Sequence, residues 1–254
     1  MDPDTPVRRT VVAADVHHYS EAAPLQQVDI QKTLIDALDS AATLSGLDRS
    51  RWYTQAQGDA ELAVLPADAP EPIVIADLVR ELTNQLARVN HAADPALRLR
   101  LRVAIHSGIV HFGHNGLPGP AAIETCRLLE ARPLKEALSA STADLALIVS
   151  DRLFHDIVEA GYRGLRAADF TSVEVAVKEF AGTGHVRLLG GPGAPAAAGD
   201  KIPTDPVRED GRTRAVRDET TLPVELPHLG AWASGDHGIA IGGDQINYGD
   251  HYGQ

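Results

Sequence analysis

Two aspartates stand where apolar segments of the chain end, in a pattern that suits a divalent-cation site. Asp15 closes the apolar run at residues 11–14, and Asp59 follows Gly58 between two short β-type segments. Carboxylate oxygens at neighbouring strand ends bind hard cations such as Mg²⁺. Two such ions can activate an attacking oxygen and clamp a phosphate during in-line displacement. Each aspartate alone has a simpler interpretation, because Asp caps helices and Gly-Asp is a common hairpin turn.

Other side chains with reactive groups are weaker candidates. Arg127 taken alone would usually be a solvated helix residue or an ion-pair partner. His17 and His18 are adjacent and would point to opposite faces of an extended segment, which favours loop or interface packing over metal binding. His106 ends a strand pattern, and a structural role is favoured there too. Cys126 is the single cysteine, so it excludes an intrachain disulfide and a cysteine zinc site, and we expect it to be buried.

The composition of the 254-residue chain predicts a globular protein of one large or two small domains. Apolar residues make up 44% of the sequence, which is enough for a substantial core. The net charge of −12 argues against nucleic-acid binding but not against a nucleotide held through cations. The N-terminus lacks an apolar signal region and no apolar stretch reaches membrane-spanning length, so we expect a cytoplasmic protein without a membrane partner.

Strand and helix patterns alternate over residues 1–190, which we expect to form one domain. The predicted elements are strands at 8–16, within 51–66 (two), at 96–108, 143–150, 173–180 and 184–190, and helices at 24–44, 71–89, 120–134 and 151–161. This order predicts an α+β fold, a ferredoxin-like βαββαβ sheet with helices on one face and a C-terminal αβ extension. In a βαββ arrangement the elements that carry Asp15 and Asp59 can be neighbours.

Apolar periodicity supports two of these elements most clearly. The helix at 71–89 places a stripe of large residues on one face: Val74, Leu78, Leu82, Leu86 and Val89. The strand at 96–108 alternates Leu97, Leu99, Leu101, Val103 and Ile105 with Arg98, Arg100, Arg102, Ala104 and His106. That alternation predicts one face on a core and one polar face.

Four segments recur in the same order and at similar spacing in one protein family: "VVAADVHHYS", "QGDAELAVLP", "LRLRVAIHSGIV" and "CRLLEA". Together they resemble the class III nucleotidyl cyclase catalytic domain over roughly residues 8–190. The resemblance implies a two-metal reaction in which the ribose 3′-hydroxyl of a nucleoside triphosphate attacks the α-phosphate and pyrophosphate leaves. It also implies a homodimer with sites across the interface.

The resemblance assigns roles residue by residue. Asp15 and Asp59 match the aspartates that hold two Mg²⁺ or Mn²⁺ ions, and the backbone carbonyl of Val16 would complete a metal shell. Arg127 matches the arginine that stabilises charge on the phosphate in the transition state, and it would be supplied by the partner protomer. A planar guanidinium suits that role because it offers several fixed donors.

Substrate-recognition positions depart from the family pattern. Gln55 stands where members usually carry a base-reading lysine, and Ile123 stands where they carry a ribose-orienting asparagine. The second base-reading position falls around Gly116, without an Asp or Cys counterpart. Two interpretations stay open: an enzyme that reads a different base, such as a pyrimidine, or a cyclase fold kept without turnover.

The C-terminal quarter has a different composition. Residues 191–228 are rich in Gly, Pro and charge and are expected to be a disordered linker. Residues 229–254 repeat Gly-Asp and carry Ile239, Ile241 and Ile246 among Gly, Asn and Gln, a composition that can stack as cross-β ladders. This tail resembles the amyloid-signalling motifs of microbial immune systems, and a disordered low-complexity tail is the simpler alternative.

These observations favour a homodimeric cyclase that makes a 3′,5′-cyclic nucleotide and pyrophosphate in intracellular signalling. The alternative is a catalytically inactive cyclase-fold module that acts in assembly or signal relay, with a protein partner bound through its tail.

Overall fold

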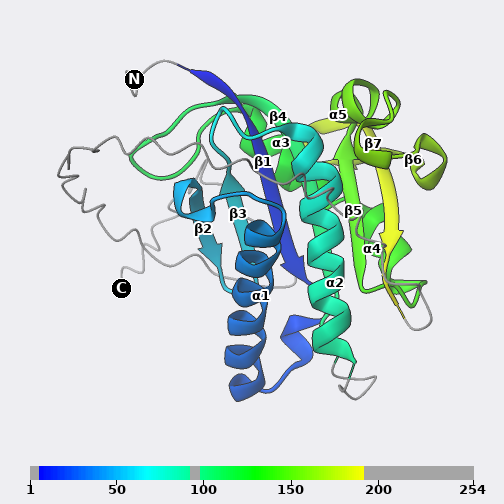
Figure 1. Ribbon diagram of the computed structural model, residues 1–254. Coiled ribbons are helices and arrows are strands. Elements are labelled where there is room, and N and C mark those ends of the chain that lie inside the picture. The colour runs from blue at the N-terminus through cyan, green and yellow to red at the C-terminus, as the bar shows by residue number, and fades with distance from the viewer. Residues whose placement is uncertain (1–5, 92–97, 192–254) are drawn as a thin grey trace, which may run out of the picture.

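A seven-stranded sheet organises the chain, with strand order β2-β3-β1-β4-β5-β7-β6 (Figure 1). The computed structural model describes residues 6–91 and 98–191. The expected α+β architecture is confirmed. The proposed tail, all but the first residue of the proposed linker, and Leu97 lie outside the described residues, so the predicted boundaries at 190 and 228 stay predictions.

The strands are β1 Val7–Val16, β2 Tyr53–Gln57, β3 Ala60–Val64, β4 Leu101–Val110, β5 Leu145–Ser150, β6 Thr171–Val177 and β7 Phe180–Leu189. The helices are α1 Pro24–Leu44, α2 Val79–Asn90, α3 Pro120–Leu129, α4 Arg132–Ser139 and α5 Asp151–Leu153. Two π-helical stretches adjoin them, Ile73–Leu78 before α2 and Phe154–Val158 after α5. Single 3₁₀ turns lie at Tyr19–Glu21, Arg49–Arg51, Tyr162–Gly164 and Ala167–Asp169.

The first four strands form the predicted βαββαβ arrangement. β1 lies in the middle and pairs antiparallel with both β3 and β4, and β2 pairs with β3 as an edge hairpin. β5 then extends the sheet parallel to β4, and β7 and β6 follow as antiparallel neighbours. The C-terminal extension expected from the sequence is therefore a continuation of the same sheet.

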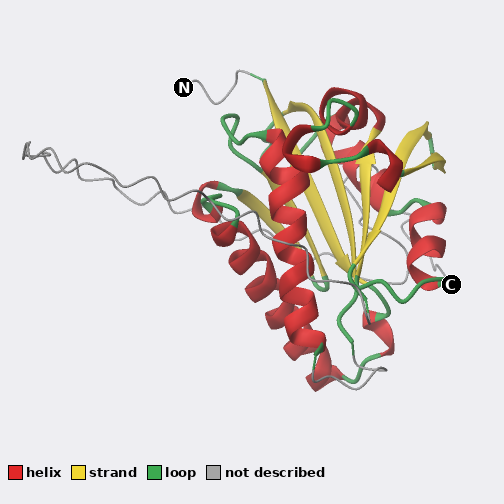
Figure 2. Ribbon diagram, turned by 45° about the vertical axis from the view of Figure 1, so that its right-hand side comes forward, coloured by secondary structure: helices red, strands yellow, loops and turns green. Residues whose placement is uncertain are grey.

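The two helices of the βαββαβ unit lie on one face of the sheet as predicted, and the helices α3 and α4, which follow β4, cover the other face, which the sequence did not predict. The long helices α1 and α2 pack side by side on one face, and α3 and α4 lie on the other (Figure 2). Ala104 and His106, predicted on a polar face of β4, are 0% and 8% exposed beneath α3. The close approach depends on small residues, since a Cβ placed on Gly108 would lie 2.8 Å from the Cβ of Ala121.

Several predicted elements also differ in extent or in the face they bury, and the last two strands are Thr171–Val177 and Phe180–Leu189 where 173–180 and 184–190 were expected. The helix expected over 120–134 is two helices, because Pro133 lacks the N–H that a continuous helix needs and stands in the first turn of α4. The strand expected from residue 96 begins at Leu101. In α2 the buried stripe continues at Asn90 and leaves Val89 41% exposed.

Asn90 belongs to a buried polar network that joins α2, β4 and β5. Asp144 is 1% exposed and pairs with the guanidinium of Arg98. It also accepts hydrogen bonds from Asn90 Nδ2 at 2.9 Å and from the Gly191 N–H at 2.9 Å. Arg98 therefore neutralises a buried carboxylate. The alternation of residues 96–108 predicted that Arg98 would lie on a polar, solvated face, and its pairing with Asp144 explains why it is buried instead.

Replacing Asp144 by alanine should lower the free energy of unfolding by about 3 kcal/mol, because it leaves a buried guanidinium without its counter-charge. Urea denaturation followed by circular dichroism measures this. The matched control is Asp156→Ala, which removes an exposed ion pair with Arg152 and should change the free energy by less than about 0.5 kcal/mol. Equal losses of unfolding free energy in the two variants would contradict the conclusion that the buried network stabilises the fold.

Candidate functional site

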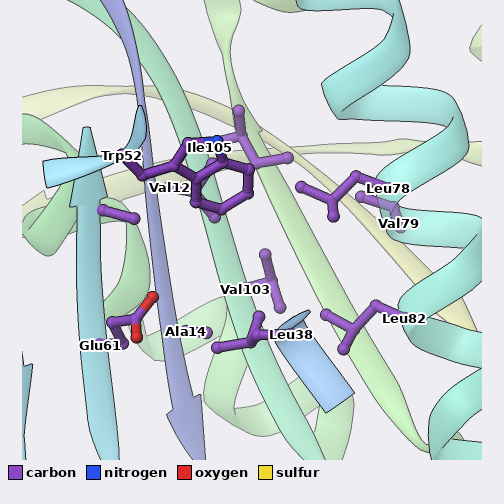
Figure 3. Close-up of a pocket in the computed structure, with 11 residues that line it drawn as sticks. Val12, Ala14, Leu38, Trp52, Glu61, Leu78, Val79, Leu82, Val103 and Ile105 are labelled. Carbon is purple, nitrogen blue, oxygen red and sulfur yellow. The ribbon is translucent and has the colours of Figure 1, made fainter. Parts of the chain in front are cut away.

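A cavity between the sheet and the helices α1 and α2 is too small to be a ligand site. It measures about 10 Å³ and is lined mainly by apolar side chains, among them Leu38, Trp52 and Leu82 (Figure 3). Its acidic member, Glu61, is held by Arg49 through two hydrogen bonds of 2.6 and 2.8 Å. A cavity of this size holds one water molecule at most, so the candidate site lies elsewhere, on the opposite face of the sheet.

The two predicted metal aspartates meet where β1 ends beside the β2–β3 hairpin. Asp15 lies opposite Ala60 in the antiparallel pairing of β1 with β3. The backbone N–H of Val16 donates to the carbonyl of Asp59 at 3.1 Å. The side chains of Asp15 and Asp59 share a hydrogen bond. The strand order that the sequence predicted therefore does make these carboxylates neighbours.

The electrostatics of Asp15 reflect burial and a second carboxylate. Burial raises the pKa of Asp15 from its ordinary 3.8 to about 7, and the neighbouring charge of Asp59 adds to the rise. Arg102 and Lys135 lower the pKa and only partly offset these effects. Arg102, directly opposite on β4, forms an ion pair with Asp15, and both side chains are largely buried. Burial and Asp59 thus disfavour the ionised form of Asp15 in spite of Arg102, and a divalent cation bound here would stabilise that form.

The donor set fits hard divalent cations. The neighbouring carboxylates of Asp15 and Asp59 disfavour each other's ionised form, and a divalent cation at the same place would satisfy both groups at once. The nearby backbone of Val16 adds a carbonyl oxygen to the candidate ligands. Arg102 already supplies one positive charge here, so a metal ion must compete with its guanidinium for Asp15.

The two predicted base-reading positions also lie side by side. Gln55 stands opposite Leu62 in the β2–β3 pairing, on the sheet face that α3 partly covers. Gly116 belongs to a tight turn closed by a 2.8 Å hydrogen bond from the Gly113 N–H to its carbonyl, and its φ is +102°. A Cβ on Gly116 would lie 2.9 Å from Nε2 of Gln55. The amide of Gln55 therefore occupies the space that a side chain at position 116 would need.

Arg127 lies in the last turn of α3 and is paired within its own chain. Its side chain is 11% exposed, and its Nη1 lies 3.5 Å from Oε2 of Glu130. Ile123, one turn earlier, is 36% exposed. The structure thus brings together Asp15, Val16 and Asp59, while Arg127 pairs with Glu130.

Two charged residues of this region were not identified from the sequence. The sequence pattern places Arg102 only on a polar strand face, and the register of β4 against β1 is what shows that it faces Asp15. Lys135 comes from α4 and influences Asp15 through space. The histidines also differ from expectation, because the rings of His17 and His18 contact each other edge to face, 3.8 Å apart, rather than pointing to opposite sides. The positive φ of His18, 61°, turns the chain there.

Comparison with known proteins identifies the fold. No protein-family model and no curated protein sequence matches the chain. An adenylate/guanylate cyclase/hydrolase from Silicibacter pomeroyi has a similar structure, with a TM-score of 0.52 and 17% identity over 72% of this chain and 98% of that one. The guanylyl cyclase Cya2 gives a TM-score of 0.50 and 16% identity over 76% and 96% of the two chains. The chain has the fold of class III adenylate/guanylate cyclase catalytic domains.

Over residues 6–91 and 98–191, none of the helices combines the length and the apolar composition that crossing a membrane requires.

Proposed function

We propose that the chain is a nucleotidyl cyclase that converts a nucleoside triphosphate to a 3′,5′-cyclic nucleotide and pyrophosphate. The observation that carries this proposal is the contact between Asp15 and Asp59 on a cyclase fold, at the junction of β1 with the β2–β3 hairpin. Two neighbouring, partly buried carboxylates can bind the divalent cations that accompany a polyphosphate substrate.

In this proposal some residues bind the cations and another faces the substrate. Asp15 and Asp59, with the Val16 carbonyl, would hold two Mg²⁺ or Mn²⁺ ions, and such ions would supply neutralisation of the triphosphate and a lower pKa for the attacking hydroxyl. As a metal ligand, Asp15 would exchange its ion pair with Arg102 for the cation. Arg102 then remains beside the site as a positive group facing the polyphosphate, where it favours binding of the anionic substrate.

Base recognition in the proposed enzyme depends on Gln55. Its neutral amide offers both hydrogen-bond donors and an acceptor, unlike the lysine of the family pattern, which only donates. Gly116 beside it contributes backbone and no side chain. The pair thus presents the amide of Gln55 to the base. In the family pattern a lysine at this position reads a purine, so the amide is compatible with a different base. Ile123 offers no hydrogen bond to the ribose.

Exposed apolar side chains near this region support a homodimer. Phe112 is 46% exposed and packs edge to face on Tyr53 of β2, with ring centroids 5.3 Å apart. Ile123 is 36% exposed on α3, which covers the same face of the sheet. A second copy of the chain would cover these side chains and would bring another Arg127 toward the carboxylates.

A non-catalytic module is the second candidate, and two observations favour it. The ion pair between Arg102 and Asp15 satisfies a proposed metal ligand without a metal. Ile123 replaces a group that the family pattern uses on the ribose. In that case the domain would serve assembly or signal relay, with a protein partner bound through residues 229–254.

Turnover by the purified full chain distinguishes these candidates. We expect one of ATP, GTP, CTP or UTP, incubated separately with Mg²⁺ or Mn²⁺, to give a cyclic nucleotide identified by mass spectrometry, with an equal amount of pyrophosphate. Chelation of the metal should stop the reaction. Absence of a cyclic product from all four nucleotides with both metals would contradict the enzyme and favour the module.

A further inference from the structure

Three metal-binding side chains converge at the far end of β5, away from the proposed catalytic site. Asp151 begins α5 directly after β5, His155 follows one turn later, and His185 lies on β7 opposite Val149. One ligand atom of each lies within 4.8 Å of the others. Oδ1 of Asp151 is 2.9 Å from Nε2 of His185 and 3.4 Å from Nε2 of His155. Two imidazole nitrogens and a carboxylate oxygen thus surround one point.

Both histidine rings are held in orientation by other groups. Nδ1 of His155 lies 2.7 Å from Oε2 of Glu159, which turns its Nε2 toward Asp151. A carboxylate on the remote nitrogen is the usual second partner of a metal-ligating histidine. The ring of His185 is 5% exposed and stacks on Phe154 at 3.6 Å with an interplanar angle of 1°. The ligand directions are therefore fixed by groups outside the cluster.

A simple helix-surface ion-pair ladder explains only part of this arrangement. Asp151, His155 and Glu159 follow one another at four-residue spacing, as such ladders do. His185, however, comes from a different strand, is buried, and directs its Nε2 at the same carboxylate oxygen. The neighbouring cation, Arg152, pairs with Asp156 instead. Half of the Asp151 side chain is exposed, which leaves room for an ion and a water molecule.

We propose that Asp151, His155 and His185 bind one Zn²⁺ ion. Two imidazoles and one carboxylate suit zinc and not Mg²⁺, and three protein ligands leave the fourth tetrahedral position to water. The ion joins the segment after β5 to β7, so it stabilises this end of the domain.

The site is independent of the proposed cyclase activity. Asp15 faces Arg102, which lies beside Ala146 at the start of β5, whereas Asp151 follows the end of that strand. The six residues of β5 separate the two places by roughly 20 Å. In Figure 1 the arrowhead of β1 and the helix α5 lie at opposite ends of the sheet.

Metal binding by the full chain tests the proposal. After treatment with a chelator, we expect the protein to bind one equivalent of Co²⁺ with the visible absorption of a four-coordinate ion, and Zn²⁺ should displace it while excess Mg²⁺ should not. A hundredfold excess of Zn²⁺ over its dissociation constant should raise the melting temperature by roughly 5–10 °C. Asp151→Asn and His155→Ala should each weaken Zn²⁺ binding at least about tenfold.

His18→Ala is the matched control, because it removes an exposed histidine that also contacts a carboxylate, that of Glu21. This variant should bind Zn²⁺ as tightly as the unmodified chain. The chain has 11 histidines, so the comparison between variants locates the ion. Failure to bind an equivalent of Zn²⁺, or undiminished binding in both Asp151→Asn and His155→Ala, would overturn the proposal. Both replaced side chains are half exposed, so the variants should fold.

Discussion

The variant Asp59→Asn is expected to lose cyclase activity by at least about 1,000-fold, and Asp15→Asn by a similar factor. Each change removes one negative ligand from a site whose two carboxylates contact each other. Loss of metal-assisted charge stabilisation is worth several kcal/mol, and each 1.36 kcal/mol changes the rate tenfold. Initial rates of cyclic nucleotide formation, measured over a titration of Mg²⁺ and Mn²⁺, check this prediction.

Asparagine is the suitable replacement because it keeps the size of the side chain and its hydrogen bonds. Alanine at position 15 would leave the largely buried Arg102 with no acceptor at all, whereas the amide oxygen of asparagine can still accept a hydrogen bond from it, so a folding defect is less able to imitate a catalytic one. The control variant is Asp68→Asn, which alters an exposed carboxylate paired with Arg51. Near-normal turnover of either site variant at any metal concentration would show that the carboxylates are not the metal ligands.

Much of the fold could be predicted because local patterns determine single elements. The period of α1, the hairpin at Gly58-Asp59 and the apolar run of β1 each specify one element without help from the rest of the chain. The second helical layer could not be predicted in this way. Ala104 carries no sign of the face it occupies, because alanine suits a core and a surface alike, and only the close packing of α3 decides that it is buried.

The candidate site could also be predicted only in part, because local patterns place its strand ends but not the contacts between strands. Strand ends and strand order bring Asp15 and Asp59 together, and both follow from local patterns. The partner of Asp15 depends on register: β4 must pair with β1 so that Arg102, and not Arg100, stands opposite. Arg100 instead donates to the carbonyls of Leu138 and Ala143. Two arginines with the same local pattern therefore have different roles, and the sequence alone does not distinguish them.

Mixing two inactive variants, Asp59→Asn and Arg127→Ala, is expected to restore activity. If each site combines the carboxylates of one protomer with Arg127 of the other, a heterodimer of the two variants contains one intact site. Random exchange of a symmetric dimer makes half of the dimers heterodimers, so about a quarter of the unmodified activity should return. Activity of the mixture after subunit exchange, compared with each variant alone, measures this.

The combination of Asp59→Asn with Asp15→Asn is the matched control for that experiment. Both changes fall on the same half of the site, so no heterodimer holds an intact one, and activity should not return. The ion pair of Arg127 with Glu130 adds a second criterion. If Arg127 only supports α3 through that pair, Arg127→Ala should lower the melting temperature and the mixture should stay inactive in proven heterodimers. If Arg127 acts across the interface, Glu130→Gln should leave turnover largely intact, because the guanidinium must leave Glu130 to reach the phosphate of the partner's substrate.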